Sequence, residues 1–190
     1  SMTTPDLPME KVATMVPAQG GGHRYALALL LGASTLSAVD RQILNVLVEP
    51  IRRDLSLSDT QIGLMTGLAF ALFYATMALP LARLAERMRR PLLLGGCMAL
   101  WSLFTMVCGA AQSFVQLFVA RVLVGVGEAG SGPASHALVT DITPPEKRAR
   151  ALALVGSGQP LGALIGLACG GIAADAFGWR WAFVLAGFPG

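Results

Sequence analysis

Residues 25–48 read YALALLLGASTLSAVDRQILNVLV, a stretch long enough to cross a bilayer as a single helix. Its two charged side chains, Asp40 and Arg41, are adjacent and lie deep within it. An ionised side chain at that depth costs at least ~2.5–3.5 kcal/mol on insertion scales, so such residues are rare and usually mark a pathway or a binding site. Arg121 and Glu128 interrupt another apolar stretch in the same way. Four ionisable groups inside an apolar bundle indicate transport of a charged substrate.

The composition of the 190-residue chain is that of a membrane protein. It is 54% hydrophobic and 13% charged, whereas soluble domains are about a quarter charged. Three further runs contain no Asp, Glu, Lys or Arg, and each exceeds the ~18 residues that a spanning helix needs. These runs are Gln61–Ala82, Pro91–Ala120 and Ala151–Ala174. The basic residues cluster at the ends of apolar segments, so the pI near 9.1 does not indicate a nucleic-acid partner.

We therefore predict an all-α membrane protein with five full spans and part of a sixth. The predicted spans are Arg24–Val48 (or onward to Leu55), Thr60–Ala82, Pro91–Ala110, Phe114–Val139 and Lys147–Ala173, with a sixth that begins near Trp179. Residues 1–23 are rich in Pro, Gly and Thr, and we expect them to form a disordered tail ahead of a bundle at residues 24–190. The three cysteines lie in apolar stretches without a metal-binding spacing, and no metal or cofactor is predicted.

Two helix starts have a recognisable capping pattern. Ser58 and Gln61 have the spacing of a capping box, in which side chains bond the free N–H groups of the first turn. Thr143 and Glu146 repeat that spacing, with Pro145 at the first helical position, where a missing N–H costs nothing.

The distribution of Lys and Arg outside the spans predicts a cytoplasmic N-terminus in the inner membrane. On that orientation, the cytoplasmic set is Lys11, Arg24, Arg83, Arg87, Arg89, Arg90, Lys147, Arg148 and Arg150, against Arg52, Arg53 and Arg180 outside.

Several motifs in the expected order resemble the major facilitator superfamily of transporters. ARLAERMRR at residues 82–90 is similar to its basic signature Gly-x-Leu-Ala-Asp-Arg-x-Gly-Arg, with departures at Ala82, Glu86 and Arg89. Arg121 with Gly125 and Gly127 resembles its second motif, and GQPLG at residues 158–162 resembles the Gly-Pro-x-x-Gly element common in antiporters. GWRW at residues 178–181 is typical of the entry to the sixth helix.

A narrower resemblance is to the bacterial spinster family. It is carried by DRQ at residues 40–42, LSDTQIGL at residues 57–64 and GVGEAG at residues 125–130. It implies proton-linked export or exchange of an anionic amphipathic lipid, such as a lysophospholipid or a sphingoid phosphate. A proton-linked exchanger of drugs or organic anions is the alternative.

The superfamily resemblance also implies an architecture. The chain ends inside the sixth apolar segment, so we expect the N-terminal six-helix bundle of a longer protein, built as a 3+3 inverted repeat, with a C-terminal bundle as its partner. Glu86, Arg87 and Arg90 are then expected to act as a conformational latch, and the same charges also suit a simple anchor on the cytoplasmic side.

Arg41 needs an acidic partner in the membrane, and Glu128 is the best candidate. Adjacent side chains on a helix point ~100° apart, so Asp40 does not face Arg41. If the first span continues to Leu55, Arg41 lies ~21 Å from the external end, level with Glu128; if it ends at Val48, Arg41 is level with Arg121 instead. Arginine opposite glutamate is the favourable arrangement, so we predict the longer helix.

This pair suggests a transport hypothesis. Deprotonated Glu128 binds Arg41, and protonation releases Arg41 to hold an anionic substrate, so Arg41 and Glu128 are the predicted substrate-binding residues and Glu128 is also a predicted proton carrier. Asp40 is the other candidate proton carrier. Arg121 either assists proton coupling or satisfies backbone carbonyls. A purely structural role, in which Asp40, Arg41 and Glu128 lock two helices together, is the competing interpretation.

Gly158, Gly162, Gly166 and Gly170 recur every four residues and form a smooth stripe that another helix can approach closely. Pro160 within this stripe predicts a bend. The resemblance implies that the stripe meets the C-terminal bundle; packing on the first or third span is the alternative. Tyr74, Phe70 and Phe73 are expected to pack between helices.

An intramembrane hydrolase is a remote alternative from a different class. Ser131 and His136 are close in sequence, but they lie ~140° apart around one helix, and no third orienting residue is evident. We therefore predict that the protein is not an enzyme.

Overall fold

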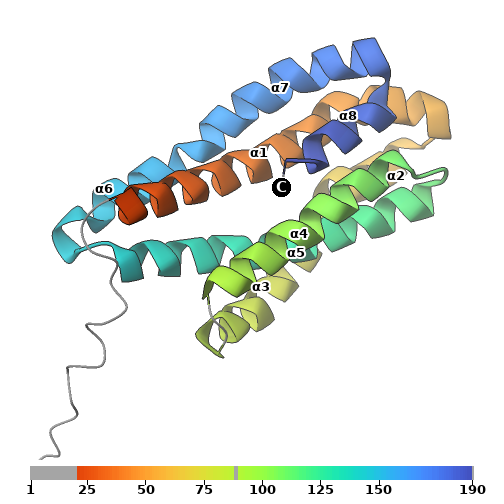
Figure 1. Ribbon diagram of the computed structural model, residues 1–190. Helices are drawn as coiled ribbons and strands as arrows, with labels where there is room; N and C mark the ends of the chain where they lie inside the picture. Colours follow the sequence, from red (N-terminus) through yellow and green to blue (C-terminus); the bar gives the residue numbers. More distant parts are fainter. Residues whose placement is uncertain (1–20, 88–89, 190) are drawn as a thin grey trace, which may run out of the picture.

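The computed structural model describes residues 21–87 and 90–189, which form helices and connecting turns and contain no strand (Figure 1). In chain order the elements are α1 (Gly21–Leu55), α2 (Asp59–Gly63), the π-helical turn η3 (Leu64–Leu68), α3 (Ala69–Arg87), α4 (Arg90–Gly109), α5 (Phe114–Ile142), α6 (Pro145–Gly156), α7 (Gly158–Phe177) and α8 (Trp179–Gly187). Five helical segments within the described residues are long and apolar enough to cross a membrane. The all-α membrane fold is confirmed.

The first span is a single helix that reaches Leu55, as the depth argument requires. It ends because Ser56 adopts a left-handed conformation with φ of 51°. The N–H of Leu57 then bonds the carbonyl of Arg52 at 3.0 Å. The prediction of the longer helix is confirmed.

The start of that helix corrects the predicted end of the tail. Residues 1–20 lie outside the described part of the chain, but Gly21, Gly22 and His23 already belong to α1. His23 Nε2 lies 3.2 Å from the hydroxyl of Thr143, which ties the first turn of α1 to the connection between α5 and α6. The boundary at residue 23 was therefore placed too late.

Of the two predicted capping boxes, one is confirmed and one is wrong. The hydroxyl of Ser58 accepts from the Gln61 N–H, and the Ser58 N–H donates to the Gln61 side chain at 2.9 Å. Helix α6 begins at Pro145 as expected, but no side chain caps it. The hydroxyl of Thr143 is engaged by His23 instead, which is a contact between distant segments that no local pattern reveals.

The fifth span is interrupted between α6 and α7, at Ser157. Pro160 has no N–H to donate to the carbonyl of Gly156, so the regular ladder is broken at this point. The boundary between α6 and α7 lies three residues before Pro160, and the bend itself stays a prediction.

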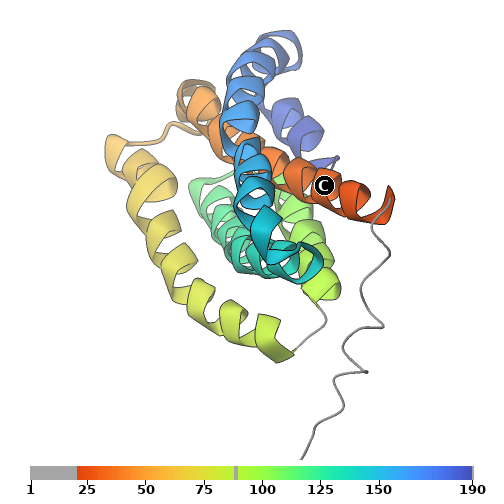
Figure 2. The ribbon, with the colours of Figure 1, turned by 90° about the vertical axis from the view of Figure 1, so that its left-hand side faces the viewer.

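Helix pairing follows the predicted 3+3 repeat. The first span, α1, packs most closely on the fifth, α7, and the fourth span, α5, packs on the second, α3 (Figures 1 and 2). The third span, α4, packs on the sixth, α8. Exchanging the first three spans with the last three maps these three pairs onto one another, as expected for two structurally related halves. The extensive packing of α4 on α5 is not matched between α8 and α1, and it joins the two halves.

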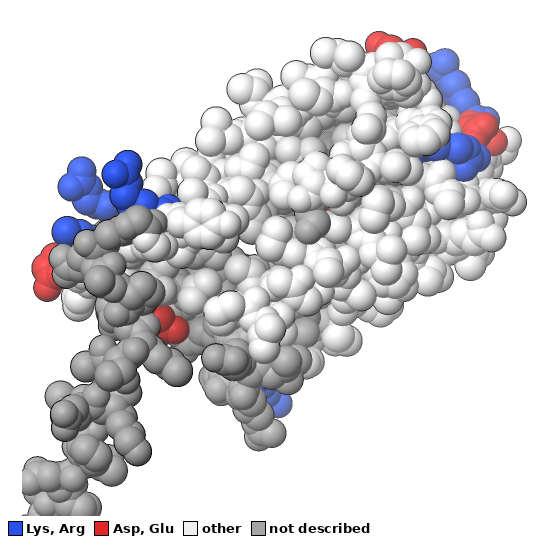
Figure 3. Space-filling view, viewed as in Figure 1, with Lys and Arg blue, Asp and Glu red and all other residues white. Residues whose placement is uncertain are grey.

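On the face shown in Figure 3, charged side chains gather at the two ends of the bundle and leave a surface without charged side chains between them. Many large apolar side chains of the spanning helices are exposed, among them Leu103, Leu164 and Ile172. An exposed apolar girdle of this kind suits a lipid environment. Two apolar clusters fill the interior, one around Trp101, Leu117 and Phe183 and one around Leu30, Val139 and Val155.

Candidate functional site

The centre of the site is an ion pair between α1 and α5. Arg41 Nε lies 3.0 Å from Glu128 Oε2; the Glu128 side chain is fully buried, whereas 40% of the Arg41 side chain is exposed. The contact predicted from helix depth is confirmed. A buried carboxylate paired with a half-exposed guanidinium leaves one face of the arginine open to a ligand.

Arg41 is held in place from its own helix. Its Nη2 donates to the hydroxyl of Ser37, one turn earlier, at 2.8 Å. Ser37 and Glu128 together fix the planar guanidinium from two sides. Because a guanidinium carries five N–H donors in a fixed plane, donors remain available for a carboxylate or a phosphate.

Glu128 lies behind Arg41. The carboxylate is buried on α5, and its Oε1 has no hydrogen-bond partner among the described residues. The hydroxyl of Ser131 donates to the backbone carbonyl of Glu128 at 2.8 Å, so it does not satisfy the carboxylate. Glu128 is not among the residues that line the adjacent cavity. The geometry thus places Arg41, and not Glu128, where it can touch a substrate directly.

Asp40 points away from this pair, into the packing between α1 and α4. It is 1% exposed, and Thr105 of α4 donates to its Oδ2 at 3.1 Å. Oδ1 of Asp40 has no hydrogen-bond partner in the described part of the chain. Arg121 is buried on α5 about two turns before Glu128, and its charge acts on both carboxylates. The four ionisable groups therefore form one electrostatic cluster with Arg41 as its exposed member.

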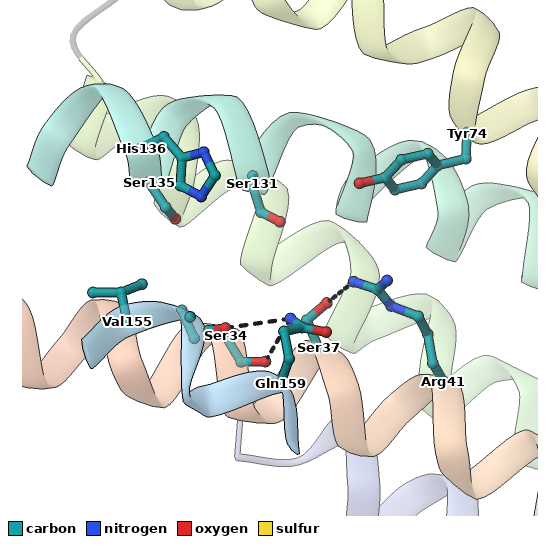
Figure 4. A pocket seen from close by; sticks show the side chains of 12 residues that line it. Ser34, Ser37, Arg41, Tyr74, Ser131, Ser135, His136, Val155 and Gln159 are labelled. Atoms are coloured by element: carbon teal, nitrogen blue, oxygen red, sulfur yellow. Dashed lines mark hydrogen bonds between the residues drawn. The ribbon is translucent and has the colours of Figure 1, made fainter. Parts of the chain in front are cut away.

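A cavity of about 260 Å³ opens in front of Arg41 (Figure 4). Its walls come from α1, α3, α5 and the junction of α6 with α7. Most of the lining side chains are polar: Ser34, Ser37, Arg41, Tyr74, Ser131, Ser135, His136 and Gln159. The apolar side chains of the lining are Ala33 and Val155, and with the ring of Tyr74 and the backbone they leave the wall polar and apolar in similar measure. Such a lining suits an anion with further hydrogen-bonding groups.

Sequence reasoning missed most of this lining, although a signal was present. Ser34, Ser37 and Arg41 follow the i, i+3, i+7 spacing of one helix face, and Glu128, Ser131 and Ser135 repeat it on α5. Two polar stripes that each contain an ionised residue are unusual in spanning helices.

Two further lining residues come from other helices. Tyr74, expected to pack between helices, lines the cavity from α3. Gln159 donates to the backbone carbonyl and hydroxyl of Ser34, both at 3.2 Å, and closes the wall between α1 and α7. Neither position has a local sequence signal that separates it from ordinary packing.

The glycine stripe of α7 packs on α1, and the expectation that it meets another bundle was wrong. A Cβ added to Gly158 would lie 2.8 Å from the Leu31 carbonyl oxygen, and one added to Gly166 would lie 2.9 Å from the Gln42 Cβ. Gly170 approaches Ile43 at a similar distance, and Gly162 approaches the Thr35 carbonyl more closely still. The stripe lets α7 approach the helix that carries Asp40 and Arg41.

The structure does not describe the side chains of the predicted latch residues. Glu86 and Arg87 end α3 and Arg90 begins α4, but their side chains lie outside the part of the chain that the structure describes.

The opposite end of the bundle carries an ion-pair cluster that sequence reasoning did not anticipate. Arg180 Nη2 lies 2.8 Å from Asp54 Oδ2, and Trp179 Nε1 donates to the same oxygen at 3.2 Å. Arg180 also donates to the Ala111 carbonyl. The cluster connects the end of α1, the start of α8 and the turn between α4 and α5.

A helical membrane bundle with a buried ion pair beside a polar cavity is typical of the class of proteins that move solutes across membranes. Comparison with known families specifies this class: residues 30–190 match the model of the Major Facilitator Superfamily, and the chain belongs to that superfamily.

Individual relatives agree with this assignment. The chain is 44% identical over 162 residues to an MFS-type efflux pump of Mycolicibacterium smegmatis, an alignment that covers 85% of this chain and 38% of the relative. It is 33% identical over 159 residues to a hexuronate transporter of Bacillus subtilis, over 84% of this chain and 37% of that protein.

Among solved structures, it is similar to a bacterial homologue of the human lysosomal transporter Spinster in an inward-facing, occupied conformation, with a TM-score of 0.85 and 35% identity over 90% of this chain and 42% of that one. The chain thus spans less than half the length of these relatives. The resemblance to the spinster family is confirmed at the level of fold and sequence.

Proposed function

We propose that this protein is a secondary transporter that couples protons to the movement of an anionic substrate held by Arg41. The proposal rests on one observation, the buried Arg41–Glu128 pair at the wall of a polar cavity. Membership of a superfamily of transporters supports the activity.

The charge balance of the interior suggests how coupling works. Asp40, Arg41, Arg121 and Glu128 sum to zero when both acids are ionised. An anion that enters beside Arg41 adds an uncompensated negative charge to a medium where charge is costly. One proton taken up by Glu128 restores neutrality and releases Arg41 from its partner. Proton and anion then bind together, which favours co-transport over exchange of one for the other.

Asp40 is the second candidate proton carrier in this scheme. Its unpaired Oδ1 is buried, and Thr105 bonds only the other oxygen. Arg121 keeps the cluster neutral by acting on both carboxylates. In this arrangement Asp40 and Arg121 tune the cluster and do not contact the substrate.

Two classes of anion are candidates for the substrate. The likeness to a Spinster homologue supports an amphipathic lipid whose phosphate reaches Arg41, such as a lysophospholipid or a sphingoid phosphate. The polar part of the lining suits a small organic anion, because hydroxyl, amide and imidazole groups share the cavity with Arg41. Relatives named as hexuronate and L-galactonate transporters support this second class.

The hydrolase alternative has no support in the cavity. Ser131 and His136 both line it, but the Ser131 hydroxyl donates to the Glu128 carbonyl, away from the imidazole. Membership of a transporter superfamily also speaks against an enzyme.

For the setting, we propose a multi-pass protein of the inner membrane with a cytoplasmic N-terminus, supported by the bias of Lys and Arg. Glu86, Arg87 and Arg90 then remain proposed latch residues, and a second helical bundle is the proposed partner across the cavity.

Proteoliposome transport tests the proposal most directly. Uptake of lysophosphatidylglycerol and of glucuronate is measured with and without an imposed pH gradient, for the wild type and for Arg41→Ala, Glu128→Gln and the control Arg53→Ala. Arg53 lies on the same helix but pairs with the exposed Glu49. We expect Arg41→Ala to lose uptake and Glu128→Gln to lose its response to the gradient, with Arg53→Ala unchanged. If both cavity variants retain gradient-driven uptake of either probe, the proposal is wrong.

A further inference from the structure

A second pocket, separate from the cavity at Arg41, lies at the end of the bundle where α1 and α6 begin. Its volume is about 230 Å³, and it is lined by His23, Leu27, Thr143, Lys147, Arg150, Ala151 and Leu154. We propose that this pocket binds the phosphate head group of an anionic phospholipid, with an acyl chain along its apolar wall. The inference concerns a different site from the proposed transport function and does not depend on it.

The pocket is a built feature of two helices. Lys147, Arg150, Ala151 and Leu154 follow the i, i+3, i+4, i+7 spacing, so they share one face of α6. That face is opposed by His23 and Leu27, one turn apart on α1. The 3.2 Å contact between His23 and the buried Thr143 holds the two walls together.

Both walls change from polar to apolar in the same direction. Leu154 lies seven residues after Lys147, about 10 Å further into the bundle, and Leu27 lies about 6 Å beyond His23. Leu154 is 46% exposed, so an apolar surface continues outward from the pocket. A phospholipid has the same sequence of groups, a charged head at the membrane surface and chains that run inward.

The charge of this pocket is available to a ligand. Lys147 and Arg150 are exposed, and neither has an ion-pair partner among the residues described, whereas Arg52, Arg53 and Arg180 at the other end are all paired. Glu146 precedes Lys147 but lies ~100° around the helix and does not line the pocket.

Two neighbouring features support an anion at this position. Arg148 donates to the Thr143 carbonyl and braces the turn that leads into α6. The amino-terminal end of the twelve-residue α6 adds its positive dipole to the charge of the pocket. The basic cluster is visible at the end of the molecule where α1 and α6 begin (Figure 3).

Native mass spectrometry of the complete protein, released from detergent in the presence of defined lipids, tests this site. The probes are dioleoyl phosphatidylglycerol, dioleoyl phosphatidylcholine and glycerol phosphate, which has the head-group charge but no chains. The variant Lys147→Gln/Arg150→Gln is compared with the matched control Arg52→Gln/Arg53→Gln. We expect phosphatidylglycerol to bind about 30-fold more weakly to the first variant, the effect of two basic residues near anionic lipid, and normally to the control.

A third variant separates the lipid from a free phosphate. Leu154→Ser removes part of the apolar wall and keeps both cations, so it should weaken phosphatidylglycerol severalfold and leave glycerol phosphate unchanged. Equal binding of phosphatidylglycerol by the charge variant and the wild type would overturn the site. Binding of glycerol phosphate as tight as that of phosphatidylglycerol would assign it to a soluble anion instead. If the charge variant fails to fold, Leu154→Ser still tests the site. Unchanged binding of phosphatidylglycerol by this variant would reject the proposed acyl-chain wall.

Discussion

Two ion pairs of helix α1 have similar geometry in opposite surroundings, one at its middle and one near its C-terminal end. Arg41 and Glu128 meet at 3.0 Å in the interior, with the carboxylate fully buried. Arg180 and Asp54 meet at 2.8 Å near the end of the helix, with side chains 40% and 47% exposed. The distance between the charged groups is therefore similar in the two pairs and does not distinguish them. The exposed fraction of the carboxylate side chain does, because Glu128 is buried and Asp54 is not.

The two ion pairs differ in what solvates the carboxylate once its arginine moves away. Water solvates Asp54 at once, so this pair contributes at most about 1 kcal/mol. Glu128 has no water-exposed surface, so it needs either Arg41 or a proton. The exposed pair therefore only joins two helix ends. In the interior pair, protonation of Glu128 would break the ion pair and leave Arg41 able to bind another anion.

Removal of the interior arginine should have the largest effect. We expect Arg41→Ala to destabilise the fold by about 3 kcal/mol, the lower part of the range for breaking a buried pair, because Arg41 is itself partly exposed. Uptake of the anionic probes should fall at least tenfold. Thermal unfolding in detergent measures the first effect and proteoliposome uptake the second; a variant as stable as Arg53→Ala would remove the contrast between the two pairs.

Loss of the hydrogen bond from Thr105 to Asp40 should have the second largest effect. Thr105→Val keeps the shape of the side chain but leaves both oxygens of a buried carboxylate without a partner. A hydrogen bond to a charged group is worth about 1.5–3 kcal/mol, and we expect a loss of stability in that range together with an altered pH profile of uptake. Thr76→Val, which removes only an exposed bond within α3, is the control. Equal effects of the two variants would show that Asp40 is not part of the interior cluster.

A packing variant tests whether α7 positions the helix that carries Arg41. A methyl group at Gly162 would collide with the Thr35 carbonyl, whereas one at Gly171 of the same helix meets nothing within 4 Å. We expect Gly162→Ala to cost about 1–3 kcal/mol and Gly171→Ala to be neutral or slightly stabilising. Thermal unfolding of the two variants side by side decides this, and equal melting temperatures would contradict the close approach of α1 and α7.

The smallest effect is expected at the exposed pair. Asp54→Asn should lower stability by less than about 1 kcal/mol and leave uptake unchanged. The loss should shrink further in 1 M salt, where exposed charges are screened. A loss as large as that of Arg41→Ala would show that exposure does not separate the two pairs.

The sequence predicted the elements of this fold well because spanning helices are read from long apolar runs. It also predicted the contact of Arg41 with Glu128, since rise per residue fixes depth once a helix end is known. Thr143 was assigned the wrong partner because His23 is 120 residues away.

The glycine stripe shows a different limit. Its spacing at Gly158, Gly162, Gly166 and Gly170 correctly predicted a surface for close helix contact, but a smooth surface fits any helix and does not identify its partner. The cavity lining was missed for the same reason: Tyr74 and Gln159 join the wall of the cavity through tertiary packing. The helical period predicts which residues of one helix share a face. Which residues of different helices lie next to each other depends on the tertiary fold and cannot be read from that period.

The pH dependence of anion binding is the most direct test of coupling between Glu128 and Arg41. The dissociation constants of glucuronate and lysophosphatidylglycerol are measured between pH 5 and 8 for the wild type and Glu128→Gln. If one proton binds together with the anion, the wild-type affinity should rise by up to about tenfold for each unit that the pH falls, and the variant should have a flat profile. A wild-type affinity independent of pH, or the same slope in Glu128→Gln, would contradict the account.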